Sequence, residues 1–269
     1  MNIPFIAKNA KLTADILKKQ EEKFLDIFAE LMEKAEEFNV TIRVIGSIAF
    51  RLKAPEYKHI QYKNQRYLAD LDLVTYSKHI TRVQDTFFSL GWTEKQNVLR
   101  LFGDKRRIFY HPDQEIHADI FIDKLRFCHP IDLRKRLELD YPTISLIDLL
   151  LAKLQIVKIN KKDLVDIMLL MRKYPIAHNP QKDTVDIEYL AKICSKNWGW
   201  WKTVTTNLDK VLQFSGSYLN QSDAKIVREK INTMIDTIHN KRKTISWNVR
   251  NMIGEKMKWY NEVEEVQRD

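Results

Sequence analysis

Carboxylates on predicted strands are the residues of this sequence best suited to chemistry. Asp70 and Asp72 lie two positions apart in an apolar segment, so both should point to one face of a strand, with their backbones about 6.6 Å apart. A second predicted strand offers Asp119, between Ala118 and Ile120. Three carboxylates on neighbouring strands repel one another unless a cation lies between them, and hard oxygen ligands suit Mg²⁺ or Mn²⁺. The alternative is that all three are ordinary strand-end aspartates.

The pair Gly46-Ser47 adds a place for phosphate next to these carboxylates. It follows a predicted strand over 41–45 and precedes a short predicted helix over 48–52. Glycine lets the backbone approach a ligand closely, and the start of a helix presents N–H groups suited to phosphate. Two metal ions about 3.5–4 Å apart could then stabilise the attacking and leaving oxygens of a phosphoryl transfer. The sequence contains no GxxxxGK[ST], GxGxxG, HExxH, CxxC or GxSxG motif, which argues against several other classes of site.

A mixed sheet must position these residues. Apolar residues at helical spacing predict a long helix over 13–38, and alternating residues predict strands over 68–76 and 115–123. Between them we expect a loop over 54–67, a helix over 78–90 and a hairpin of two strands; further helices are expected along the rest of the chain. The hairpin strands are 98–102 and 107–110, and the helices are 133–139, 145–157, 162–174, 186–194, 200–214, 222–239 and 246–266.

This order of elements predicts an α+β fold, a mixed sheet with flanking helices followed by an all-helical C-terminal region. The segment Pro175–Thr184 has the composition of a linker, so we expect one domain over 1–175 and a helical domain over 176–269.

The order strand, Gly-Ser, helix, strand with Asp-x-Asp, strand with one further Asp resembles the DNA polymerase beta-like nucleotidyltransferase superfamily over about residues 40 to 125. The resemblance implies a nucleotidyltransferase-like first domain in which Gly46 and Ser47 hold the triphosphate of an NTP. It also implies that Asp70, Asp72 and Asp119 are catalytic and bind metal, with Asp119 activating the acceptor hydroxyl. Asp123, on the same strand face, is the alternative third carboxylate; flanking apolar residues favour Asp119.

A later segment resembles the abortive-infection type nucleotidyltransferase toxins. Lys153 lies in an apolar helix, and the sequence KKDLVD follows at Lys161–Asp166. The resemblance implies that Lys153 lies near the phosphates and that Asp166 lies in or beside the catalytic centre. It also makes an antitoxin protein a candidate partner. The alternatives are a lysine whose stem is buried on a core helix, a capping role for Asp163 and an exposed position for Asp166.

The expected function is Mg²⁺- or Mn²⁺-dependent transfer of a nucleoside monophosphate from an NTP to a hydroxyl. The chain carries a formal net charge of +9, with a pI of about 9.3, which favours a polyanionic acceptor such as RNA, with tRNA as the natural candidate. The alternatives are a small-molecule acceptor, as in antibiotic-modifying relatives, and a non-catalytic nucleotide-binding protein of the same fold.

Two groups of aromatic residues allow both a structural and a binding interpretation. The insert Arg51–Tyr67 mixes basic residues with tyrosines, which suits phosphate binding and base stacking but equally a solvated loop. The cluster Trp198-Gly199-Trp200-Trp201 favours packing between helices over a platform for bases.

The cysteine content and the hydropathy predict a cytoplasmic protein. Cys128 and Cys194 make neither a disulfide framework nor a zinc cluster, and they are typical of reduced thiols. The first residues contain no apolar signal region. Asp148 and Lys153 interrupt the most apolar segment, Thr143–Val157, so we expect no membrane partner.

Overall fold

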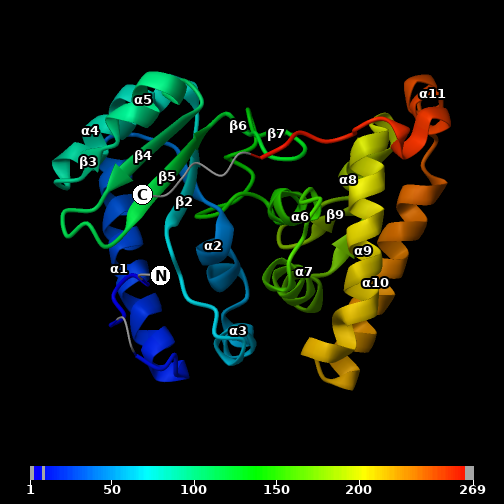
Figure 1. Cartoon of the computed structure of the whole chain (residues 1–269), viewed down its shortest axis with the longest axis horizontal. Helices are drawn as coiled ribbons and strands as arrows, with labels where there is room; N and C mark the ends of the chain where they lie inside the picture. The colour runs from blue at the N-terminus through cyan, green and yellow to red at the C-terminus, as the bar shows by residue number, and fades with distance from the viewer. Residues whose placement is uncertain (1–2, 8–9, 264–269) are drawn as a thin grey trace. The chain divides into compact units, whose positions relative to one another are not determined.

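A computed structural model of the chain describes residues 3–7 and 10–263 and divides into two compact units (Figure 1). The N-terminal unit comprises Met1–Leu125 and Asp132–Ser145, and the C-terminal unit comprises Arg126–Ile131 and Leu146–Asp269. The structure is mixed helix and sheet, which is consistent with the predicted α+β class. The division falls near residue 145, whereas the sequence suggested a boundary at 175.

A five-stranded mixed sheet forms the centre of the N-terminal unit. Its order is β1-β2-β5-β4-β3, in which β2 and β5 are parallel and all other neighbours are antiparallel. The strands are β1 (Ile42–Val44), β2 (Leu71–Thr75), β3 (Thr93–Glu94), β4 (Arg106–Tyr110) and β5 (His117–Ile122). The parallel contact at the centre of the sheet brings the two predicted carboxylate strands side by side.

Five helices accompany this sheet, and α1 packs against α3 and α4. Helix α1 begins after Thr13, whose Oγ1 accepts a hydrogen bond from Ile16 N at 3.3 Å, and it buries Phe24, Phe28 and Leu31, as its periodicity predicted. The helices are α1 (Ala14–Glu37), α2 (Gly46–Lys53), α3 (Lys58–Lys63), α4 (Ile80–Ser89) and α5 (Gln96–Phe102).

Three predicted elements of this unit are wrong. Residues 98–102 belong to helix α5 instead of a hairpin strand, and β4 pairs with β3 and β5. A run of five residues is too short for the spacing of its apolar residues to distinguish a helix from a strand. The predicted loop over 54–67 contains a 3₁₀ turn, Pro55–Tyr57, and helix α3, while the predicted helix over 133–139 is a series of turns with Lys135 at φ +62°.

The C-terminal unit is mainly helical. Five of its helices begin at side-chain caps: Asn160, Asp186, Asn197, Asn220 and Thr244 each accept a hydrogen bond from the backbone N–H three residues later. Each such cap contributes about 1 kcal/mol. The helices are α6 (Leu146–Leu154), α7 (Lys161–Lys173), α8 (Ile187–Lys196), α9 (Trp198–Tyr218), α10 (Gln221–Asn240) and α11 (Ile245–Ile253).

The remaining elements are short. The two-residue strands β8 (Ile176–Ala177) and β9 (Val185–Asp186) pair in parallel, and β6 (Lys124–Leu125) lies beside β7 (Ile131–Asp132). The helix predicted over 246–266 ends at Ile253, because Gly254 takes φ +59°; a 3₁₀ turn, Gly254–Lys256, and an extended segment follow. The part of that prediction over 264–266 lies outside the described residues. Among the described helices, none combines the length and apolarity needed to cross a bilayer.

Buried His129 should make the stability of the C-terminal unit depend on pH. Burial lowers its pKa to about 4, and its Nε2 lies 2.8 Å from Thr203 Oγ1. Between about pH 6.5 and 4, this histidine is therefore protonated in the unfolded chain but neutral in the folded unit. The unfolding free energy should fall as the pH drops through this range and change little below it.

Urea unfolding of His129→Gln at pH 7 and pH 4.5 measures this effect. On acidification, the unfolding free energy of the variant should fall by up to about 3 kcal/mol less than that of the wild type. His239→Gln, at an exposed position on α10, is the control and should behave as the wild type. Equal pH dependence in the wild type and His129→Gln would contradict the prediction.

Candidate functional site

The register of β2 and β5 brings two of the predicted carboxylates together. Asp72 is the cross-strand partner of Asp119, and Leu71 pairs with Ala118. Asp70 immediately precedes β2, two residues before Asp72. Asp70 and Asp119 are buried, and Asp72 is half-buried. The structure therefore gathers the three carboxylates at one place on the sheet.

Gly46 lies directly against one of these carboxylates. Its backbone has φ +64°, and a Cβ at this position would lie 2.1 Å from Asp72 Oδ2. The neighbouring Ile45 N–H donates to the backbone oxygen of Asp72 at 2.8 Å. Only glycine fits here, so the start of helix α2, with the backbone N–H groups of its first turn, sits beside the Asp72 carboxylate. Ser47, the next residue, is half-buried at the start of the same helix.

Substitution of Gly46 by alanine should weaken the fold and displace the Asp72 side chain. The positive φ costs an alanine about 1–2 kcal/mol, and the added methyl group must displace Asp72. Gly91→Ala is a matched control, because Gly91 has φ +76° and its only close neighbour is Pro112 at 3.4 Å. Urea unfolding should show a loss of stability in both variants and a larger loss in Gly46→Ala, because only there does the added methyl group meet a carboxylate. Equal losses in the two variants would contradict the close contact of Gly46 with Asp72.

Arg106 is a component of the site that the sequence analysis missed. Its Nε donates to Asp119 Oδ1 at 2.7 Å and its Nη2 contacts Asp119 Oδ2, so one guanidinium engages both carboxylate oxygens. The hydrogen bond to Asp119, together with the charges of Asp119, Asp72 and Asp70, raises the pKa of Arg106. This arginine therefore supplies positive charge to the whole carboxylate group.

A signal for Arg106 was present in the strand alternation. Arg106 pairs with Phe121, which lies two residues after Asp119 and therefore on the same face of β5. The predicted second hairpin strand began at residue 107, so Arg106 lay outside it and no sheet face was predicted for its side chain. His117 is a further neighbour of the carboxylates, since its Nε2 lies 3.8 Å from Asp70 Oδ2.

The fit of a divalent metal to this group depends on Arg106. Within residues 3–7 and 10–263, no set of three or more His, Cys, Asp and Glu side chains is arranged as a metal-binding cluster. The donor chemistry suits Mg²⁺ or Mn²⁺, since three carboxylates converge, but the oxygens of Asp119 are already engaged by the guanidinium. Metal binding by all three would require Arg106 to release Asp119.

Replacing Arg106 by glutamine should make the N-terminal unit depend on divalent metal for stability. In EDTA, Asp119 would be left buried without its cation, at a cost of about 1–3 kcal/mol. Mn²⁺ could then take the place of the guanidinium, so the gain in melting temperature on adding Mn²⁺ should be larger for Arg106→Gln than for the wild type. Lys105→Gln, at an exposed position one residue earlier, is the control. Equal gains in all three proteins would argue against a metal role for these carboxylates.

Asp123 lies away from this group. It follows the last residue of β5, has φ +60°, and accepts a hydrogen bond from Ser77 N at 3.0 Å. It lines a separate cavity of about 420 Å³ with Tyr76 and Glu138. Of the two alternatives for the third carboxylate, the structure places Asp119, and not Asp123, beside Asp72.

Lys153 and Asp166 meet in the C-terminal unit. Lys153 Nζ lies 2.6 Å from Asp163 Oδ1 and 3.1 Å from Asp166 Oδ2, and Asp166 is fully buried. Asn160 caps helix α7 by accepting from Asp163 N, which fixes the first turn that carries these aspartates. The Lys-Asp-x-x-Asp pattern thus builds a buried ion group that joins α6 to α7, and Asp166 is not on an exposed helix face.

The basic insert makes ion pairs inside the N-terminal unit. Arg51 is buried, with Nη1 2.8 Å from Glu21 Oε2, and Lys58 also pairs with Glu21. Tyr62 OH donates to the same carboxylate at 2.8 Å, and its pKa is raised to about 12 by burial and by this hydrogen bond. Arg66 is buried as well, whereas Lys63 is exposed. Much of the charge predicted to face RNA or solvent is therefore used internally.

The N-terminal unit thus places Asp70 and Asp72 beside a position that only glycine fits and beside the start of a helix, while the third carboxylate, Asp119, is paired with Arg106. The chain has no significant match to a family model, a curated protein or a solved structure.

Proposed function

We propose that the N-terminal unit transfers a nucleoside monophosphate from an NTP to a hydroxyl acceptor, using Mg²⁺ or Mn²⁺. The observation that supports this most strongly is the contact of Gly46 with Asp72, in register with Asp119 on the neighbouring parallel strand. It places a helix start suited to phosphate next to carboxylates suited to metal.

In this proposal each residue has a distinct role. Asp70 and Asp72 hold metal, and the backbone at Gly46 and the hydroxyl of Ser47 bind the triphosphate. Asp119 completes the metal site and accepts the proton of the attacking hydroxyl. The metal, when bound, stabilises negative charge on the reacting phosphate and on the leaving pyrophosphate. Asp119 must be free to act, so Arg106 leaves it when metal and nucleotide bind.

RNA, in particular tRNA, is the proposed acceptor because the chain is strongly basic, with a formal net charge of +9. Lys153 and Asp166 remain proposed contributors to nucleotide binding by their resemblance to the toxin pattern. That resemblance also keeps an antitoxin protein as a proposed partner. A small-molecule hydroxyl is the second candidate acceptor. The ion pairs of Arg51 and Lys58 with buried Glu21 favour it, since they engage two cations that RNA would otherwise contact.

Incubation of the full chain with each labelled NTP, Mg²⁺ and total RNA tests the proposal. We expect label on RNA in a gel with at least one NTP and none in EDTA. Label that appears on an added aminoglycoside or other polyol, and not on RNA, would select the small-molecule acceptor. Failure to consume any NTP with either acceptor class would count against catalysis.

A further inference from the structure

A cavity of about 540 Å³ lies within the C-terminal unit; its lining includes His129 but none of the residues proposed for nucleotidyl transfer. It is formed where the end of α8, the start of α9, helix α11 and the segment around 258–261 meet. Its volume falls in the range of small-molecule sites. Its principal side chains are aromatic or cationic: Lys196, Trp198, Trp247, Arg250, Lys258 and Trp259.

The charge of this cavity is one-sided. Three of its lining residues are Lys or Arg, and among the described residues that line it there is no Asp or Glu. Lys196 is exposed and makes no ion pair with any described residue. Arg250 is anchored, because its guanidinium donates to the backbone oxygens of Gly254 and Met257, each at 2.5 Å. The cavity therefore presents net positive charge. Among the described residues, Glu262, which does not line the cavity, pairs with Lys258.

The aromatic rings of the cavity are held in place by polar contacts. Trp198 Nε1 donates to Asn251 Oδ1 at 2.7 Å, and Trp259 Nε1 donates to Thr203 Oγ1 at 3.1 Å. The two indoles meet edge to face, with centroids 6.0 Å apart. Trp247 is 8% exposed, and its Nε1–H has no hydrogen-bond acceptor among the described residues. Rigid rings are effective stacking platforms, and the unsatisfied indole N–H favours a ligand with an acceptor atom.

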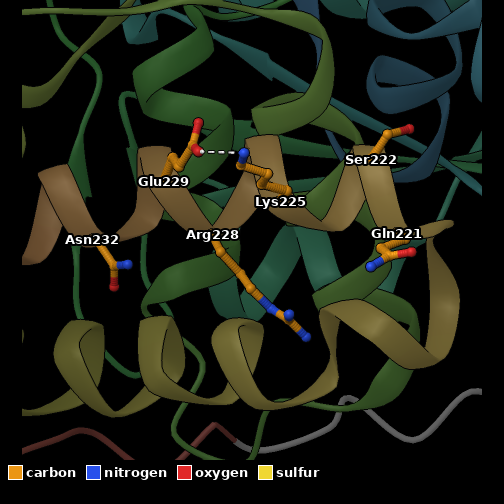
Figure 2. A pocket seen from close by; sticks show the side chains of 6 residues that line it. All are labelled: Gln221, Ser222, Lys225, Arg228, Glu229 and Asn232. Atoms are coloured by element: carbon orange, nitrogen blue, oxygen red, sulfur yellow. Dashed lines mark ion pairs between the residues drawn. The ribbon is translucent and has the colours of Figure 1, made fainter.

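A second cavity, on helix α10, differs from the aromatic cavity in its lining. Figure 2 shows that its lining side chains all come from one helix, and that Lys225 pairs with Glu229, at 4.0 Å. Arg228 points away to α9, where its Nε donates to Ser215 Oγ at 2.7 Å. In that hollow one of the two cations is paired with a carboxylate, the other bonds to a neighbouring helix, and no aromatic ring is present, so it lacks the features of a ligand site.

We propose that the cavity bounded by Trp198, Trp247 and Trp259 binds a nucleotide unit, with the base on the half-exposed indole of Trp259 and the phosphate at Lys196 and Lys258. A base needs a flat aromatic surface and a phosphate needs cations, and this cavity offers both side by side. The unit can be a free mononucleotide or the end of a single-stranded RNA. The site does not depend on the proposed transfer reaction, since all its residues belong to the C-terminal unit and none is a metal ligand.

Fluorescence anisotropy of labelled pentaadenylate RNA with the full chain in EDTA tests this site. The test variant is Lys196→Ala/Lys258→Ala, and the control is Lys192→Ala/Lys225→Ala, which removes the same charge from exposed positions that do not line the cavity. We expect the test variant to bind about tenfold more weakly, with a slope of log K against log salt about 1.4 shallower. The control should bind as the wild type.

Two tryptophan variants separate stacking from structure. Trp259→Phe keeps a ring and should bind within about threefold of the wild type, whereas Trp259→Leu should lose about fivefold to 100-fold. Adenosine monophosphate is added as competitor. Displacement of the RNA shows that a single nucleotide suffices, and absence of displacement shows that a strand is required; both support a nucleotide site.

Three results would overturn the inference. These are equal weakening by the test and control variants, no binding of either probe at low salt, and loss of RNA binding in Asp72→Ala. The last would locate the bound RNA at the carboxylates of the N-terminal unit. Because the assay contains no divalent metal and measures binding, an inactive enzyme that still binds RNA through Lys196 and Lys258 would contradict only the proposed transfer reaction.

Discussion

With Asp72 as a metal ligand of the proposed transfer reaction, Asp72→Ala should lower nucleotidyl transfer by at least about 1000-fold, because such a ligand supplies several kcal/mol of transition-state stabilisation. The residue touches Gly46 and is paired across the sheet with Asp119, so its loss removes the carboxylate at the centre of the group. The fold should remain intact, since Asp72 is half-buried and its removal relieves repulsion from its two neighbours. A small rise in melting temperature is expected.

Transfer of label from NTP to RNA measures this effect in parallel with thermal unfolding. Asp104→Ala is a control for loss of a carboxylate, because Asp104 is exposed between α5 and β4. Asp123→Ala is a second control, which should retain activity if Asp119 is the third carboxylate. A folded Asp72→Ala that transfers label at the wild-type rate would remove the basis of the proposed site. Loss of activity in Asp123→Ala would reopen the choice between the two aspartates.

Glu21→Gln should destabilise the N-terminal unit by about 3–5 kcal/mol, the cost of leaving a buried charge without its partner. Glu21 is 3% exposed and receives contacts from Arg51, Lys58 and Tyr62. Arg51 is 1% exposed, so its guanidinium cannot turn to solvent when the carboxylate is lost. Glutamine keeps the size and one oxygen of the side chain, and the loss therefore reports the charge.

Urea unfolding followed by circular dichroism measures this change, with Glu22→Gln as the matched control. Glu22 is exposed on the solvent side of the same helix, so its substitution should change the unfolding free energy by less than about 0.5 kcal/mol. The double variant Glu21→Gln/Arg51→Met should recover part of the loss, because it removes both buried charges together. Similar stability for Glu21→Gln and Glu22→Gln would show that water reaches Arg51.

Elements with a strong local signal could be predicted from the sequence. Helix α1 follows from the spacing of Phe24, Phe28 and Leu31 and from the cap at Thr13. The alternation around Asp70 and Asp72 predicted a strand, and the structure has β2 there. The break at Gly46 predicted the start of a helix. In each case neighbouring residues along the chain carry the information, because helices and strands are periodic.

The short segments were decided by their surroundings. Residues 98–102 satisfy a strand pattern by themselves, yet they form α5, with Val98 buried and Leu101 exposed. Five residues are too few to establish a period, so packing chooses the conformation. Likewise, the tryptophans at 198 and 201 could be recognised as packing residues, but the cavity that Trp198 lines together with residues distant in the chain could not.

The carboxylates of the site could be named from the sequence, but the cations that meet them could not. Asp72 and Asp119 were predictable because each lies in an apolar strand, whereas the pairing of Arg106 with Asp119 depends on the register between β4 and β5. The same holds for Arg51, which looked like a surface cation until packing buried it against Glu21. A lysine or arginine has a long side chain and no preferred neighbour along the chain, so only the tertiary structure decides which carboxylate it reaches.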